Sequence, residues 1–302
     1  MTKGELMHTK IRSLIIVFIA YILAIALGIF TFLSLETMTD ISRFLIADIV
    51  ATLTIFILST VYKNASLYDP YWSVIPPVIL FGAMLYYNSF GNTSLWMTLA
   101  ITIWAIRLTY NWASQWHGFT DMDWRYQAMK DRAPKVYLLT NLFGIQLFPT
   151  AIVFIQLILG LKVIELNPDM TIFTWLGVLM IIVAAIIQLI ADEQMKVFKE
   201  RTKGQKLCID EGLWKYSRHP NYFGEITVWW GLYVIYISIV NKLDVWILSP
   251  IMMTSLFLFI SIPWMEKKII KTRPQYKAYQ KQVSMLIPFI RKESREQVTD
   301  NA

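Results

Sequence analysis

The chain has 302 residues, of which 56% are hydrophobic and only 16% are charged. Because a typical soluble domain carries about 25% charged residues, this composition excludes an ordinary soluble domain and favours an integral membrane protein. The net charge of +7 then indicates loops that face anionic lipid headgroups rather than a nucleic-acid partner.

Apolar segments recur along the chain at lengths suited to membrane crossing, for which a helix needs about 20 apolar residues. They lie at 11–33, 43–62, 74–90, 94–113, 137–160, 172–192, 222–240 and 245–264. The third segment contains Pro76 and Pro77, which we place in its first turn, where a missing N–H is tolerated. The sequence therefore predicts an all-α polytopic membrane bundle of about eight transmembrane helices.

The positive charges agree with this count. If the N-terminus is cytoplasmic, the cytoplasmic segments hold 24 of the 28 Lys and Arg residues. The external loops hold three, Arg43, Lys162 and Lys242, and Arg107 lies within the fourth apolar segment. Such a bias is what the positive-inside rule predicts, so both termini are expected in the cytoplasm.

Several kinds of site are not indicated. No G-x-G-x-x-G or P-loop string occurs, so a Rossmann or P-loop nucleotide site is not predicted. The three histidines, His8, His117 and His219, are scattered, and no metal is expected. Cys208 is the single cysteine, which excludes an intrachain disulfide.

The densest polar cluster opens the seventh apolar segment, over residues 212–225. Pro220 favours a helix start, and Asn221 and Glu225 follow on one helix face. Arg218 and His219 add positive charge beside the free N–H groups of the first turn, which attract anions. The cluster suits a phosphate or carboxylate beside a hydrogen-bonded ring. The alternative is an interfacial cap with headgroup contacts.

Further polar clusters share the predicted cytoplasmic side. They are Asp69 to Trp72, entering the third segment; Trp104 to Asn111, followed by Gln115 and by Asp123 to Tyr126; and Asp192 to Gln194, ending the sixth segment. Arg107 can alternatively extend to the interface, and Asp192 can simply be solvated. Asp48 lies deeper, so it is either functional or a helix–helix hydrogen bond.

The tail after the last apolar segment is basic. Glu266 follows that segment and can pair with a basic residue across the site. The stretch from Arg273 to Tyr279 and the apolar stretch 286–289 come next. The alternative for this region is a basic interfacial segment bound to lipid.

These residues carry a family resemblance. The run from Ser217 to Glu225, the Gly-Leu-Trp before it, and the tail from Tyr276 and Tyr279 to Pro288 resemble the steroid 5-alpha-reductase C-terminal-domain superfamily. The Trp-Ala-x-Arg-Leu and Asp-x-Arg-Tyr strings look like its bacterial membrane branch. The resemblance covers roughly residues 60–292. It implies two N-terminal helices in 1–62, a catalytic domain in 63–292 and a polar tail in 293–302. It also implies a bacterial plasma membrane with the active site facing the cytoplasm.

The resemblance implies an NADPH-dependent oxidoreductase that reduces a carbon–carbon double bond conjugated to a ketone in a lipophilic, steroid-, sterol- or lipid-like substrate. It assigns cofactor binding to Asn221, Tyr222, Arg218, His219, Arg107, Gln115, Asp192, Arg125 and Tyr279. It assigns catalysis to Glu225, Asp69, Tyr71 and Tyr110. Trp104 stands where the steroid enzymes carry a substrate-side Tyr, and an indole cannot supply a phenolic proton. Tyr71, Tyr110 or Tyr222 can take that role.

Two other functions remain open at this point. The string from Arg218 to Gly224 and the Tyr-x-x-Tyr tail are also similar to isoprenylcysteine carboxyl methyltransferases, which bind S-adenosylmethionine. Glu225 after Gly224 favours the reductase. The third possibility is a lipid-binding or scaffold membrane protein without a cofactor. The expected partners are membrane lipids and a lipophilic small molecule.

Overall fold

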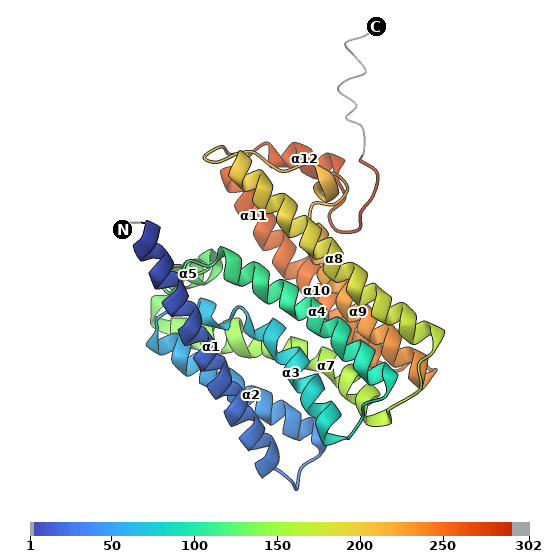
Figure 1. The fold of residues 1–302 in the computed structure, drawn as a ribbon. Helices are drawn as coiled ribbons and strands as arrows, with labels where there is room; N and C mark the ends of the chain where they lie inside the picture. The colour runs from blue at the N-terminus through green and yellow to red at the C-terminus, as the bar shows by residue number, and fades with distance from the viewer. Residues whose placement is uncertain (1–2, 292–302) are drawn as a thin grey trace. The chain divides into compact units, whose positions relative to one another are not determined.

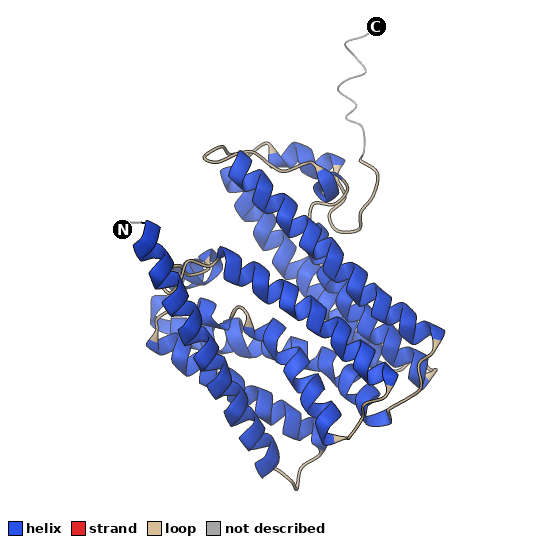
Figure 2. Cartoon of the chain, in the orientation of Figure 1, coloured by secondary structure: helices blue, strands red, loops and turns tan. Residues whose placement is uncertain are grey.

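The computed structural model describes residues 3–291 and is helical, with no β-strand in that range (Figure 2). By packing, the chain divides into two compact units, Met1–Met170 and Thr171–Ala302, called unit 1 and unit 2 below. The predicted boundary at residue 63 concerns activity rather than packing and stays a prediction. The predicted polar tail, 293–302, lies outside the described residues.

Unit 1 is built mainly from long helices joined by short turns (Figure 1). These helices are α1 (Lys3–Ser34), α2 (Asp40–Val61), α3 (Tyr71–Tyr86), α4 (Asn92–Gln115) and α7 (Phe148–Leu166). The shorter elements are η1 (Ala65–Tyr68), α5 (Trp124–Arg132), η2 (Pro134–Val136), α6 (Tyr137–Leu139) and the π-helix η3 (Thr140–Leu147), which continues into α7.

Hydrogen bonds between helix ends show how α3 and α4 run within unit 1. At one end, Asn64 lies just after α2 and Phe119 lies just after α4. The side-chain nitrogen of Asn64 donates to the carbonyl of Phe119 at 2.8 Å. At the other end, Gly91 lies just before α4 and Asn167 lies just after α7. The backbone N–H of Gly91 donates to Asn167 Oδ1 at 3.2 Å. The pair α3–α4 therefore runs from one end of unit 1 to the other.

Unit 2 is organised on two long helices, α8 (Ile172–Arg201) and α9 (Pro220–Val240), which run antiparallel side by side (Figure 1). Small residues let the two backbones approach, as is common between membrane helices. A Cβ atom added at Gly224 would lie 2.4 Å from Gln188 Cγ, and one added at Gly231 would lie 2.9 Å from the carbonyl of Gly177. The remaining elements are η4 (Gly212–Lys215), η5 (Val245–Ile247), α10 (Leu248–Leu256), the π-helix η6 (Phe257–Ser261), α11 (Ile262–Thr272) and α12 (Tyr276–Gln282).

Each of the eight predicted apolar segments lies largely on helix in the structure, although the third helix ends at Tyr86 rather than at residue 90. Among the described residues, six helical stretches are long and apolar enough to cross a membrane. They are Met7–Ser34, Asp40–Val61, Pro134–Leu166, Ile172–Arg201, Pro220–Val240 and Val245–Thr272. The other two predicted segments are α3, with 16 residues, and the more polar α4. The protein is thus all-helical and has the apolar helices of an integral membrane protein.

Several predicted boundaries were wrong. Asp192 does not end its helix, because α8 continues to Arg201 with polar residues and a basic last turn, which the helix dipole favours. Pro76 and Pro77 lie inside α3 rather than in its first turn, because α3 already begins at Tyr71. Glu266 does not follow the last helix but lies within α11.

Candidate functional site

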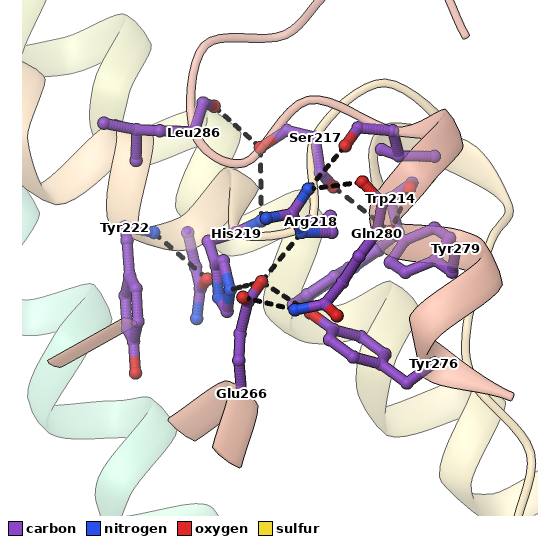
Figure 3. A network of polar contacts seen from close by, with 12 residues as sticks. Trp214, Ser217, Arg218, His219, Tyr222, Glu266, Tyr276, Tyr279, Gln280 and Leu286 are labelled. Atoms are coloured by element: carbon purple, nitrogen blue, oxygen red, sulfur yellow. Dashed lines mark hydrogen bonds and ion pairs between the residues drawn. The ribbon is translucent and has the colours of Figure 1, made fainter. Parts of the chain in front are cut away.

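A single carboxylate organises the polar cluster at the start of α9 (Figure 3). Oε1 of Glu266, on α11, accepts hydrogen bonds from Arg218 Nε at 2.7 Å and His219 Nε2 at 3.1 Å. The same oxygen accepts from Tyr276 OH at 3.0 Å, and Oε2 accepts from Gln280 Nε2 at 2.7 Å. The predicted pairing of Glu266 with a basic residue is therefore confirmed, and the partner is Arg218.

Hydrogen bonds to backbone carbonyls connect the tail to this cluster. Arg218 Nη1 donates to the carbonyls of Val283 at 2.7 Å and Gln280 at 3.0 Å, and Tyr279 OH donates to the carbonyl of Trp214. Ser217 Oγ donates to the carbonyl of Leu286 at 2.7 Å. Arg218 and Tyr279 thus fasten the tail to the loop before α9 (Figure 3).

Burial sets the charge of this cluster. It lowers the pKa of His219, although the neighbouring Glu266 opposes the shift. Burial also raises the pKa of Tyr276, and the charge of Glu266 raises it further. At neutral pH His219 is therefore a neutral donor, so the positive charge beside Glu266 comes from Arg218.

Asn221 and Glu225, one turn apart on α9, are joined through Gln188 of α8. Gln188 Nε2 donates to Glu225 Oε2 at 2.7 Å and to the backbone carbonyl of Asn221 at 3.2 Å. Trp229 Nε1 donates to Glu225 Oε1 at 3.1 Å. Glu225 is only 3% exposed, whereas Asn221 is half-buried and accepts from Tyr222 N through Oδ1. The polar face of α9 thus combines a buried carboxylate with an accessible amide.

In unit 1 a further carboxyl group, that of Asp69, is held by a phenol. Tyr126 OH, on α5, donates to Asp69 Oδ1 at 2.6 Å. Burial raises the pKa of Asp69 to about 7, while Arg125 opposes this shift and Asp123 adds to it. Arg125 itself forms an ion pair with Asp123 at 2.8 Å. Asp69 can therefore be protonated or ionised near neutral pH.

The tyrosines predicted as proton donors have different surroundings. Tyr71 is buried and its OH donates to Asp48 Oδ1 at 2.8 Å, so Asp48 does make the helix–helix hydrogen bond expected as one alternative. Tyr110 is 66% exposed. Tyr222 stacks on His219 with ring centroids 5.2 Å apart. Trp104 is buried.

The predicted cofactor residues fall in both units. Arg107 and Gln115 lie on α4, and Arg125 lies on α5. Arg107 is buried, while Gln115 is exposed and donates to Asn111 at 2.8 Å. Asp192 lies on α8, one turn beyond Gln188. Within unit 2 the structure brings together Arg218, His219, Tyr222 and Tyr279.

Sequence reasoning missed Gln188 and Gln280 as members of these clusters, and it named Tyr126 without its hydrogen bond to Asp69. Gln188 interrupts an apolar stretch of α8, and a polar side chain at that depth is costly without a partner. This cost could have identified Gln188 as a residue that needs a polar partner. Gln280 and Tyr126 lie in polar segments, where no such contrast exists.

Comparison with known proteins places the chain in a family. Residues 55–283 match the family described as "Protein of unknown function (DUF1295)", which is associated with steroid 5-alpha-reductase-like proteins. An uncharacterized protein of Schizosaccharomyces pombe is 24% identical over 255 residues, which cover 75% of this chain and 73% of the relative. No solved structure matches the chain.

Proposed function

The chain belongs to the DUF1295 family, and on that premise we propose that it is an NAD(P)H-dependent membrane reductase of a lipophilic enone or a related carbon–carbon double bond. The observation that carries the proposal is the polar face of α9. There Asn221 and Glu225 lie one turn apart and are held by Gln188.

These side chains fit the carboxamide of a nicotinamide. A carboxamide offers an NH₂ donor and a carbonyl acceptor. Glu225 can accept from the first, since each oxygen of a carboxylate can accept more than one hydrogen bond. Asn221 can donate to the second through Nδ2, which makes no hydrogen bond within residues 3–291. When bound, the nicotinamide supplies the hydride. Glu225 and Asn221 would fix the orientation of its ring.

Arg218 and His219 fit a different role from the predicted one. Arg218 Nε and His219 Nε2 donate to Glu266, and Arg218 Nη1 donates to tail carbonyls. We therefore propose that they support the loop before Asn221, and that other basic groups contact the phosphates. For the substrate side we propose Asp69 with Tyr126, because a carboxyl group that titrates near pH 7 can hold a proton for transfer.

The proposed topology has eight crossings, with both termini and the polar clusters in the cytoplasm. Its support is the 24-to-3 bias of Lys and Arg and the path of α3 and α4 from the Asn64 end to the Asn167 end of unit 1. A bacterial plasma membrane is part of the same proposal, from the resemblance of the Trp104 to Leu108 string.

Ligand-dependent melting of the detergent-solubilised protein tests the cofactor class. A ligand that binds only the folded state stabilises it by mass action, by about 2.7 kcal/mol at a concentration of 100 Kd. We expect NADPH to raise the Tm more than S-adenosylmethionine does. If S-adenosylmethionine or its demethylated product alone raises the Tm, the chain is a methyltransferase. If neither class of ligand does, the lipid-binding or scaffold function stands.

A further inference from the structure

The last described stretch of the chain exposes apolar side chains. Ile287, Phe289 and Ile290 are 65%, 68% and 78% exposed. Single exposed apolar residues are ordinary, but a contiguous group of large ones marks a contact surface. We call residues 285–290 the apolar tail segment.

The apolar tail segment is fixed to the loop that precedes α9. Arg218 N donates to the carbonyl of Ser284 at 2.8 Å, and Ser217 Oγ donates to the carbonyl of Leu286 at 2.7 Å (Figure 3). Phe289 N donates to the carbonyl of Tyr216 at 3.0 Å. These bonds hold the segment at both of its ends, so its exposed side chains have a defined place in unit 2.

That place is at the end of a membrane-crossing helix. The anchoring residues 216–218 lie two to four positions before Pro220, the first residue of the apolar stretch Pro220–Val240. An extended chain rises about 3.3 Å per residue, so Tyr216 lies within about 13 Å of the helix start. The headgroup layer adds about 5–7 Å on each side of the hydrocarbon core, so the segment lies at or close to that layer.

The charge around the segment fits anionic lipid. Between residues 262 and 291 the chain has seven Lys or Arg residues and one carboxylate, Glu266, and one of the seven, Arg291, pairs with Asp210 at 3.3 Å. Glu266 is occupied by four internal donors. Lys215, next to Tyr216, is exposed. Basic groups beside apolar side chains are the composition that binds membrane surfaces.

We propose that the apolar tail segment is a membrane-surface anchor, which inserts Ile287, Phe289 and Ile290 into the headgroup–acyl boundary of the leaflet at the N-terminal end of α9, with anionic lipid as its partner. The anchor would hold the tail, and with it Tyr276 and Tyr279, against the membrane face of unit 2. It is independent of the reductase proposal, since it rests on exposure, backbone hydrogen bonds and charge alone.

Site-directed fluorescence on the full chain tests the anchor. In a Cys208→Ser background, single cysteines replace Ile287, Phe289 or Ile290 and are labelled with the environment-sensitive dye NBD. Exposed Lys281 on α12 is the matched control position. The labelled proteins are placed in nanodiscs of phosphatidylcholine with 25% phosphatidylglycerol, with and without doxyl-labelled lipid.

We expect blue-shifted NBD emission and at least twofold stronger doxyl quenching at the three apolar positions than at Lys281, and a smaller shift without phosphatidylglycerol. Ile290, the most exposed of the three, gives the variant least able to disturb folding. Water-like emission at all three positions would overturn the proposal. Blue-shifted emission that doxyl lipid does not quench would also overturn it, because it would place the segment against protein, either unit 1 or a second copy.

Discussion

At the scale of single residues, two carboxylates of unit 2 have different environments and different expected roles. Glu266 accepts from Arg218, His219, Tyr276 and Gln280, and so it closes a structural network. Glu225 accepts from Gln188 and Trp229, and we expect it to accept from the cofactor as well, since a carboxylate oxygen can accept more than one hydrogen bond. Substitution of each separates structure from function.

We expect Glu225→Gln to weaken NADPH binding and to slow hydride transfer while the protein still folds, because Gln keeps the shape and one acceptor oxygen. Glu225→Ala and Asn221→Ala should be worse, since a misplaced reacting atom can cost about a hundredfold in rate. Thermal stability and NADPH affinity are measured side by side. A lower Tm with unchanged NADPH affinity would make Glu225 a structural residue.

Glu266→Ala should lower the Tm by several degrees. The change leaves Arg218 and His219 buried without their acceptor, and breaking a buried pair from one side costs about 3–5 kcal/mol. The matched control is Glu193→Gln on α8, whose exposed pair with Lys196 spans 3.6 Å and contributes about 0–1 kcal/mol. Equal Tm values for the two variants would contradict the network's structural role.

Asp69 gives stability a pH dependence. Its pKa of about 7 in the folded chain lies above the ordinary value of 3.8. Its contribution is therefore fully present below about pH 4 and is lost as pH rises through 7. Asp69→Asn stays neutral, so the Tm of the variant minus the Tm of the wild type should increase as the pH rises from 5 to 8. Asp131→Asn, at an exposed position of α5, is the control, and an equal gain there would refute the assignment.

At the scale of elements, close helix packing can be tested by adding one methyl group. Gly224→Ala places Cβ 2.4 Å from Gln188 Cγ, and overpacking costs about 1–3 kcal/mol. Gly82→Ala in α3 meets no atom within 4 Å and should stabilise, because Ala favours a helix by about 1 kcal/mol over Gly. The Tm values should move in opposite directions. A higher Tm for both variants would mean that α8 and α9 are less closely packed than described.

Apolar periodicity and length predicted the helices but not their ends. The eight apolar segments lie largely on helix because hydrophobicity and the need to pair backbone groups act together in a membrane. The end of α8 was missed because backbone pairing continues past the apolar boundary at Asp192 to Arg201. The π-helices η3 and η6 were not predicted, although each ends two residues before a proline, Pro149 or Pro263, which removes a backbone donor from the helix. At the candidate site, Glu266 and Arg218 were each predicted to lie in polar clusters. The contacts of Gln280 with both residues were not predicted, because Arg218 and Glu266 lie far apart in the sequence.

At the scale of the whole molecule, the number of crossings depends on α3 and α4. With six crossings, the loop between these two helices stays on the same side as Lys63 and the α5 region. With eight, it lies on the opposite side. The positions 37, 166 and 242 are external in both arrangements, and 128 and 205 are cytoplasmic in both, so they cannot distinguish them. The 90–92 loop therefore decides the topology.

We expect cysteine placed at Asn92, which is exposed, to react from outside intact cells with a membrane-impermeant maleimide in the Cys208→Ser background. Gly91 itself is unsuitable, because a Cβ there would lie 2.5 Å from Asn167 Oδ1. The hydrogen bond between Gly91 and Asn167 places this loop at the same end of unit 1 as the end of α7, so cysteines at 92 and 166 should react alike. A cysteine at 205 is the cytoplasmic control and should react only after permeabilisation. Labelling of 166 but not of 92 would establish six crossings and would also mean that α3 and α4 do not traverse unit 1 as the structure has them.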